Sequence, residues 1–284
     1  MPTPKEILAE VKALDKATQG AHGRLKKQIV KLFADVTARL EAFLRNPKAL
    51  SPRDTYDLAA ASKIVTQLDK ILREAGLEDF VAAYRDEFPR AAKSALSYFG
   101  TMDASLDLVG VDDTTLNAYI RYSELNLRRV VDSKLTAPLQ EAVFQGAFGS
   151  LRVGQAVEQI IERGTYLTTG QVEVEVFDKL QQFQRAVTVE KAESLGVEIY
   201  QYLGPDDSIT SPQCEFLLHI DRHGVEGMLY KDEISAKLHP KLRENPLVAG
   251  GHPRCRHKYL PVTLDYAKSQ GFVPNGELRL DEAR

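Results

Sequence analysis

Apolar residues recur every three or four positions through the first part of the chain, and this spacing constrains the fold more than any other feature. One apolar stripe runs from Leu25 to Leu44, and a second runs from Leu58 to Leu72. Side chains three and four positions apart share one face of an α-helix, so each stripe predicts a helix with one buried face. The sequence therefore predicts two antiparallel helices in this region.

Later segments continue the helical pattern and then change it. Residues 172–176 alternate as in a strand, but helical spacing continues to Val187, which favours a helix that closes at Gly196. The run Val197–Leu203 is short, β-branched and aromatic and ends at a Gly-Pro-Asp-Asp turn, so it predicts a strand. Lys258–Val262 is a second candidate strand.

These patterns predict a mainly α protein in which an extended helical N-terminal part is followed by a small α+β C-terminal domain. Small and acidic residues between Gly100 and Gly110 indicate a soft boundary. We expect a helical docking domain over residues 1–110, a second domain over residues 111–265 and a C-terminal tail over residues 266–284.

Composition limits the class of protein. Hydrophobic residues make up 43% of the chain and charged residues 27%, which is typical of a soluble globular protein. The net charge of -3 gives no general attraction to nucleic acid, so any DNA contact must be local. No window approaches the roughly 18 apolar residues of a membrane span, and we expect a protein made in a cytoplasm without membrane contact.

Cysteine and histidine residues gather in one short region. Both cysteines and five of the six histidines lie between Cys214 and His257. Zinc takes about four sulfur or nitrogen ligands in a tetrahedron, and His252, Cys255 and His257 supply three within six residues. We therefore expect one structural zinc ion, held by Cys214, His252, Cys255 and His257, and a loop fixed at both ends by these residues.

Two alternatives to zinc remain open at this stage. A zinc ribbon would carry two Cys-x-x-Cys pairs, whereas Ser211 occupies the place of one expected cysteine. Cys214 and Cys255 could instead form a disulfide, although cytoplasmic assembly disfavours it. They could also be buried thiols beside hydrogen-bonded histidines.

The same region carries an ordered motif that resembles a known family. The pieces follow in one order: Gly196–Pro205 (GVEIYQYLGP); Asp207, Thr210, Pro212 and Cys214; Tyr230–Ile234; Gly250-Gly251; Cys255-Arg256-His257; and Pro261-Val262. This set resembles the phage head morphogenesis family, the minor head proteins similar to the F protein of phage Mu. The resemblance covers about residues 135–265 and is specific as an ordered set.

The resemblance implies a minor head protein of a tailed bacteriophage, acting in head assembly at or near the portal and in the handling or ejection of packaged DNA. Such a protein would be assembled in the host cytoplasm and would lie in the virion, in the head interior or at the portal vertex. Its partners would be the portal and other head proteins, with weak nonspecific contacts to packaged double-stranded DNA. Many relatives have a cysteine near Ser211 and Cys-Arg-Cys in place of Cys255-Arg256-His257, which weakens a metal role carried over from them.

A compact basic edge surrounds His257. We expect Arg254 and Lys258 to face DNA or a partner, because phosphate contacts use such side chains. Arg256 lies within the family motif, and we expect it to form an ion pair inside the fold with one of Asp206, Asp207 and Glu233.

Two enzymatic functions compete with this interpretation. In a metal-dependent nuclease or hydrolase, His252 or His257 would activate water and acidic residues would hold the ion, namely Asp206, Asp207 or Asp221. An ADP-ribosyltransferase-like toxin would use Glu173-x-Glu175, but residues two apart on a helix do not face one pocket. No nucleophile with a base and an orienting partner is evident, so we expect no enzymatic activity and name no catalytic residue.

Overall fold

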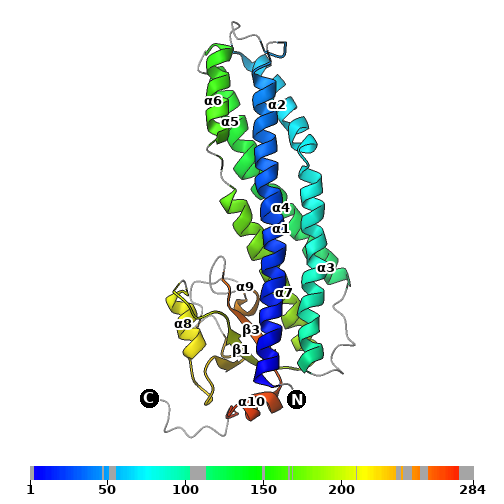
Figure 1. Cartoon of the computed structure of the whole chain (residues 1–284), viewed down its shortest axis with the longest axis vertical. Coiled ribbons are helices and arrows are strands. Elements are labelled where there is room, and N and C mark those ends of the chain that lie inside the picture. Colours follow the sequence, from blue (N-terminus) through cyan, green and yellow to red (C-terminus); the bar gives the residue numbers. More distant parts are fainter. Residues whose placement is uncertain are drawn as a thin grey trace. The chain divides into compact units, whose positions relative to one another are not determined.

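The structure is a computed structural model of the whole chain (Figure 1). It describes residues 3–46, 48–50, 56–102, 113–148, 151–165, 167, 169–208, 210–234, 238, 245–249 and 255–274.

The protein is mainly helical, as the apolar spacing predicts, and it has one small antiparallel sheet. The longer helices are α1 (Pro4–Leu44), α2 (Leu58–Glu74), α3 (Leu77–Met102), α4 (Asp113–Val131), α5 (Ala137–Phe148), α6 (Val153–Thr165) and α7 (Gly170–Ser194). A π-helical turn, η2 (Asp132–Thr136), joins α4 to α5. The C-terminal part contains β1 (Ile199–Leu203), α8 (Pro212–His219), β2 (Met228–Tyr230), α9 (Pro246–Ala249), β3 (Lys258–Val262) and α10 (Leu264–Ser269). None of the described helices is both long enough and apolar enough to cross a membrane.

The chain forms two compact units, and each is assembled from separate segments. The first, here called the sheet unit, contains Met1–Gly20, Glu87–Tyr119 and Phe177–Arg284. The second, the helical unit, contains Ala21–Asp86 and Ile120–Val176. Neither unit coincides with residues 1–110 or 111–265, because α1, α3, α4 and α7 each contribute residues to both units. Apolar spacing alone does not show that one helix supplies two cores.

The helical unit has an apolar interior made by the stripes that the sequence predicts. Ile29, Val36, Ile64 and Leu68 are fully buried. Helices α5 and α6 approach closely at Gly146, where an added Cβ would lie 3.0 Å from the Ala156 Cβ. A glycine at this point therefore permits the helix contact.

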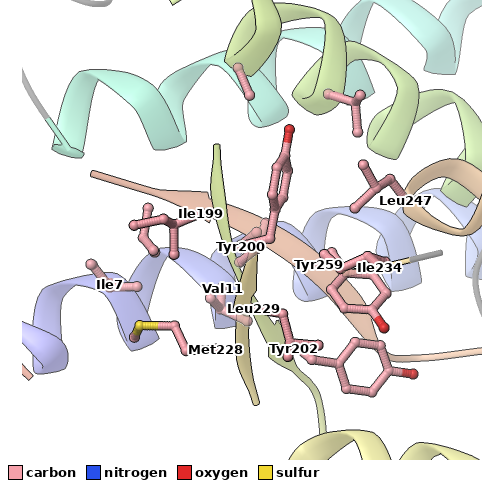
Figure 2. Packing of buried hydrophobic residues seen from close by; sticks show 14 of the residues in the cluster. Ile7, Val11, Ile199, Tyr200, Tyr202, Met228, Leu229, Ile234, Leu247 and Tyr259 are labelled. Carbon is pink, nitrogen blue, oxygen red and sulfur yellow. The ribbon is translucent and has the colours of Figure 1, made fainter. Parts of the chain in front are cut away.

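The sheet unit is built around β1. Strand β1 lies between β2 and β3 and pairs antiparallel with both, so that Tyr200 faces Leu229 on one side and Pro261 on the other. The sheet packs on apolar residues from the start of α1, including Ile7 and Val11 (Figure 2). The Tyr98 hydroxyl of α3 donates to the Pro261 carbonyl at 2.8 Å, which ties that helix to β3.

Part of the expected C-terminal tail belongs to this core. Tyr266, Ala267 and Phe272 are buried in the same apolar cluster as the sheet. Residues 275–284 lie outside the described part of the chain. The ordered sheet unit therefore extends beyond residue 265.

Candidate metal centre

The first cysteine of the cluster is placed by the start of α8. Ser211 is the N-cap residue, and its hydroxyl accepts a hydrogen bond from the Cys214 backbone N–H at 3.3 Å. Pro212 follows in the first turn, where a missing N–H costs nothing. The serine that replaces an expected cysteine thus caps the helix that carries Cys214, whose side chain is fully buried.

Cys255 and His257 return to Cys214 from the segment that leads into β3. All three side chains are buried, and their ligand atoms lie within 4.8 Å of one another. The two Sγ atoms are 3.8 Å apart and are not joined in a disulfide. Among the described residues, this is the one group of three such side chains close enough to share a metal ion.

The contacts of His257 leave one ring nitrogen suited to a metal. Nε2 lies 2.9 Å from the Pro205 carbonyl oxygen, which can only accept, so Nε2 must carry the proton. Nδ1 then has the lone pair, and it is buried with no hydrogen-bond partner in the described part of the chain. A ligating histidine usually donates its other N–H to such an oxygen, so the residues fit a metal.

Gly204 allows this approach of His257. A Cβ at Gly204 would contact Cδ2 of the imidazole ring and would lie 2.9 Å from the His257 Cα. Both approaches, to the imidazole Cδ2 and to the Cα of His257, are closer than ordinary van der Waals contact. The Cα belongs to the backbone and cannot easily move away. Any larger residue at position 204 would therefore displace His257.

The sequence did not single out Tyr202, which completes the cluster. Its hydroxyl donates to the Cys214 Sγ at 3.2 Å and lies 4.0 Å from the Cys255 Sγ. Its ring stacks on His257 at 5.5 Å with an interplanar angle of 9°. Only the antiparallel register, which pairs Tyr202 with Tyr259, brings the end of β1 to the cysteines.

The protein environment holds these groups in their neutral forms when no metal is bound. The hydrogen bond with Cys255 and then burial raise the pKa of the Cys214 thiol. Burial, followed by the nearby Cys255, raises the pKa of the Tyr202 phenol. A cation among them would reverse this preference, because it stabilises anionic sulfur and oxygen.

A buried arginine supports the segment that carries two of the three residues. From α7, the Arg185 Nη2 donates to the carbonyl oxygens of Cys255 and His257, each at 2.8 Å. Its Nη1 donates to the Ala249 carbonyl at 3.3 Å. Burial lowers the pKa of this guanidinium. Arg185 lies far from the cysteines in sequence, and apolar spacing gave no signal for it.

The expected basic edge is corrected at Lys258. Its side chain is only 3% exposed, and Nζ pairs with the Asp15 Oδ1 at 2.5 Å, so Lys258 does not face DNA or a partner. All positions of β3 are buried, including Lys258, the first residue of the strand.

The expected ion pair of Arg256 is confirmed, since its guanidinium donates to both carboxylate oxygens of Asp207 at 2.7 and 2.8 Å. His252 and Arg254 lie outside the described residues.

The acidic residues of the enzymatic alternatives have other contacts. Asp206 approaches Nε2 of His219 at 3.3 Å, while Asp221 accepts from the Gly224 N–H at 2.7 Å. Glu173, at the start of α7, pairs with Lys26 at 2.9 Å. These contacts occupy the carboxylates with neighbours in the fold.

Comparison with known proteins gives no match to a family model, to a curated protein or to a solved structure. The fold and the buried cluster therefore have to be interpreted from their own geometry and from the sequence motif.

Proposed function

We propose that this protein is a minor head protein of a tailed bacteriophage, located in the head interior or at the portal vertex and active in head assembly. The observation that supports this is the convergence of the motif residues. The described pieces of the motif, which are scattered between Gly196 and Val262, lie in or directly beside β1, β2, β3 and the first turn of α8. Gly250 and Gly251 lie outside the described residues. A motif whose parts build one small sheet is typical of a shared domain, which favours the resemblance over a chance match.

We further propose that the buried cluster is a structural zinc site. Cys214, Cys255 and His257 would hold the ion, and the sequence offers His252 as a fourth candidate. Bound zinc would crosslink the start of α8 to the segment before β3. It would take part in no reaction, because a structural zinc site only holds the fold together. The free Nδ1 of His257 and the two close thiols support this role.

Elemental analysis and thermal unfolding test the zinc site. The purified full chain should contain about one zinc per molecule and should melt at a lower temperature after the metal is removed, because binding stabilises only the folded state. Cys214→Ser should lose the metal, whereas the exposed Phe216→Ser in the same helix should keep it. Equal melting temperatures of metal-free and zinc-loaded protein would exclude a structural zinc ion.

Particle composition tests the head assignment. Mass spectrometry of purified virions and proheads should find the full-length protein in few copies, and it should cosediment with portal-containing particles. Because both compact units combine distant segments, fragments cut near residue 110 would divide each unit, and the full chain is the appropriate sample. Absence from virions and proheads alike would defeat the assignment.

DNA binding should be weak. The net charge is -3, and Lys258 is buried, so few phosphates can be neutralised at any one place. Affinity for nonspecific duplex DNA should fall as salt increases, with a shallow dependence because few counterions are released. Tight binding that is independent of salt would contradict this part of the proposal.

A further inference from the structure

We propose that Tyr202 is the fourth ligand of the metal centre, so that the ion is bound by Cys214, Cys255, His257 and the Tyr202 phenolate oxygen. This inference rests on the zinc part of the proposed function. It assigns the fourth position to a strand residue and not to His252.

The distances among the two sulfurs and the Tyr202 oxygen are close to the edges of a tetrahedron, and the ligand atom of His257 lies within 4.8 Å of both sulfurs. Two sulfurs that are each about 2.3 Å from zinc are about 3.8 Å apart at the tetrahedral angle. The Cys214 and Cys255 Sγ atoms are 3.8 Å apart. For a sulfur and an oxygen about 2.1 Å from zinc, the edge is about 3.6 Å. The Tyr202 Oη lies 3.2 Å from one sulfur and 4.0 Å from the other, on either side of that value.

The strand holds Tyr202 in this position before any metal binds. Its ring stacks on His257 and lies against Tyr259, with ring centroids 5.5 and 4.6 Å apart. Figure 2 shows Tyr202 beside Tyr259, while Tyr200 of the same strand points away from them. These contacts fix the ring of Tyr202 before the metal arrives, which favours binding because little order must be gained.

Charge balance favours an anionic fourth ligand. Zinc with two thiolates, one phenolate and a neutral imidazole carries one net negative charge. Arg185 supplies one buried positive charge beside Cys255, and Asp178 and Asp15 act on it electrostatically. Asp15 is also the ion-pair partner of Lys258. An anionic metal centre would place a further negative charge beside the Arg185 guanidinium, which a neutral histidine in the fourth position would not do.

Metal binding must then release a proton from the phenol as well as from both thiols. At neutral pH the full chain should release about three protons per zinc, and Tyr202→Phe should release about two. Titration calorimetry in two buffers of different ionisation enthalpy measures this number. Ionised phenol absorbs at longer wavelength than phenol, so zinc should also produce an ultraviolet difference band that Tyr202→Phe lacks.

Affinity provides a third measurement with matched controls. Tyr202→Phe removes one oxygen and keeps the stacked ring, and it should weaken zinc binding by more than the roughly 10–100-fold caused by losing an outer-shell contact. Tyr200→Phe is the control, because its hydroxyl is also buried in β1 and has no hydrogen-bond partner among the described residues. It should leave the proton count, the difference band and the affinity unchanged, as should His252→Ala.

The outcomes separate the two proposals. Three-proton release by Tyr202→Phe, or loss of zinc in His252→Ala with no effect of Tyr202→Phe, would overturn the assignment of Tyr202. A wild-type chain that binds no zinc would overturn both the metal site and Tyr202 as its ligand. Absence of the protein from phage particles would defeat the head assignment but would leave the result for Tyr202 standing.

Discussion

The two compact units bury different kinds of side chain. Most of the buried side chains of the helical unit are apolar, such as Ile29, Ile64 and Leu68, although Glu173 is a buried carboxylate there. The sheet unit buries Arg185 and Lys258 as well, together with His223 and His257. The helical unit therefore depends mainly on filling volume, whereas the sheet unit also depends on stabilising several buried charged side chains.

These two kinds of interior should respond differently to small chemical changes. An apolar core tolerates substitutions that preserve volume, often at a cost of less than about 1.5 kcal/mol. Removing one partner of a buried ion pair leaves a charge without compensation, even when the volume is unchanged. Substitutions that alter single atoms should therefore be most damaging in the sheet unit.

The largest expected effect tests the ion pair between Asp15 and Lys258. Asp15→Asn preserves shape but leaves the buried ammonium unpaired, and it should destabilise the protein by about 3–5 kcal/mol. Denaturant unfolding would measure the loss. The double variant Asp15→Asn/Lys258→Met removes both charges and should recover much of it. An Asp15→Asn variant as stable as wild type would mean that the ion pair with Lys258 does not stabilise the protein.

An intermediate effect compares one glycine from each unit. Gly204→Ala places a methyl group against His257 and should cost about 1–3 kcal/mol, besides lowering zinc content. Gly23→Ala, within α1, meets no atom within 4 Å and should stabilise the protein by about 0.5–1 kcal/mol. Unfolding curves and zinc analysis of both variants provide the comparison. A Gly204→Ala variant with the stability and zinc content of wild type would contradict the close approach at Gly204.

The smallest expected effect concerns the exposed His219. Hydrogen bonds to Glu226 and then to Asp206 raise the pKa of His219 above its ordinary value of 6.5. The folded state therefore binds the proton more tightly than the unfolded state does. The stabilisation is complete below pH 6.5 and disappears as the pH rises through the folded pKa.

NMR titration of the His219 ring measures this shift. Glu226→Gln should lower the pKa more than Asp206→Asn does, because the Glu226 hydrogen bond is the larger cause. In unfolding experiments, the difference in stability between wild type and His219→Gln should shrink as the pH rises. A pKa that both variants leave unchanged would show that the carboxylates do not contact His219 in solution.

Local sequence patterns predicted much of the secondary structure. The stripe that ends at Leu44 became α1, the stripe from Leu58 to Leu72 lies in α2, and residues 172–187 lie in α7. Lys258–Val262 is β3 as predicted, and the other strand begins at Ile199, two residues later than expected. These features follow from residues close in sequence, whose spacing decides which face is buried.

The candidate site was only partly accessible to such reasoning. Cys214, Cys255 and His257 could be named because their residue types are rare and clustered, and the structure brings them together. Tyr202 and Arg185 could not be named, because tyrosine and arginine are common and neither lies in the cysteine-rich segment. Lys258 was wrongly expected at the surface, because the strand pattern does not reveal that Asp15 covers it.

The sequence by itself determined the helical character, the positions of two of the three strands and the three residues able to share an ion. The tertiary structure decided which distant residues surround these three. The strand register brought Tyr202 to the two sulfurs, and α1 brought Asp15 to Lys258. Helix α7 brought Arg185 to the carbonyls of Cys255 and His257. The physical reason is one of range. Periodicity and capping act within a few turns of chain, whereas the compensation of a buried charge depends on whichever segment the fold packs against it.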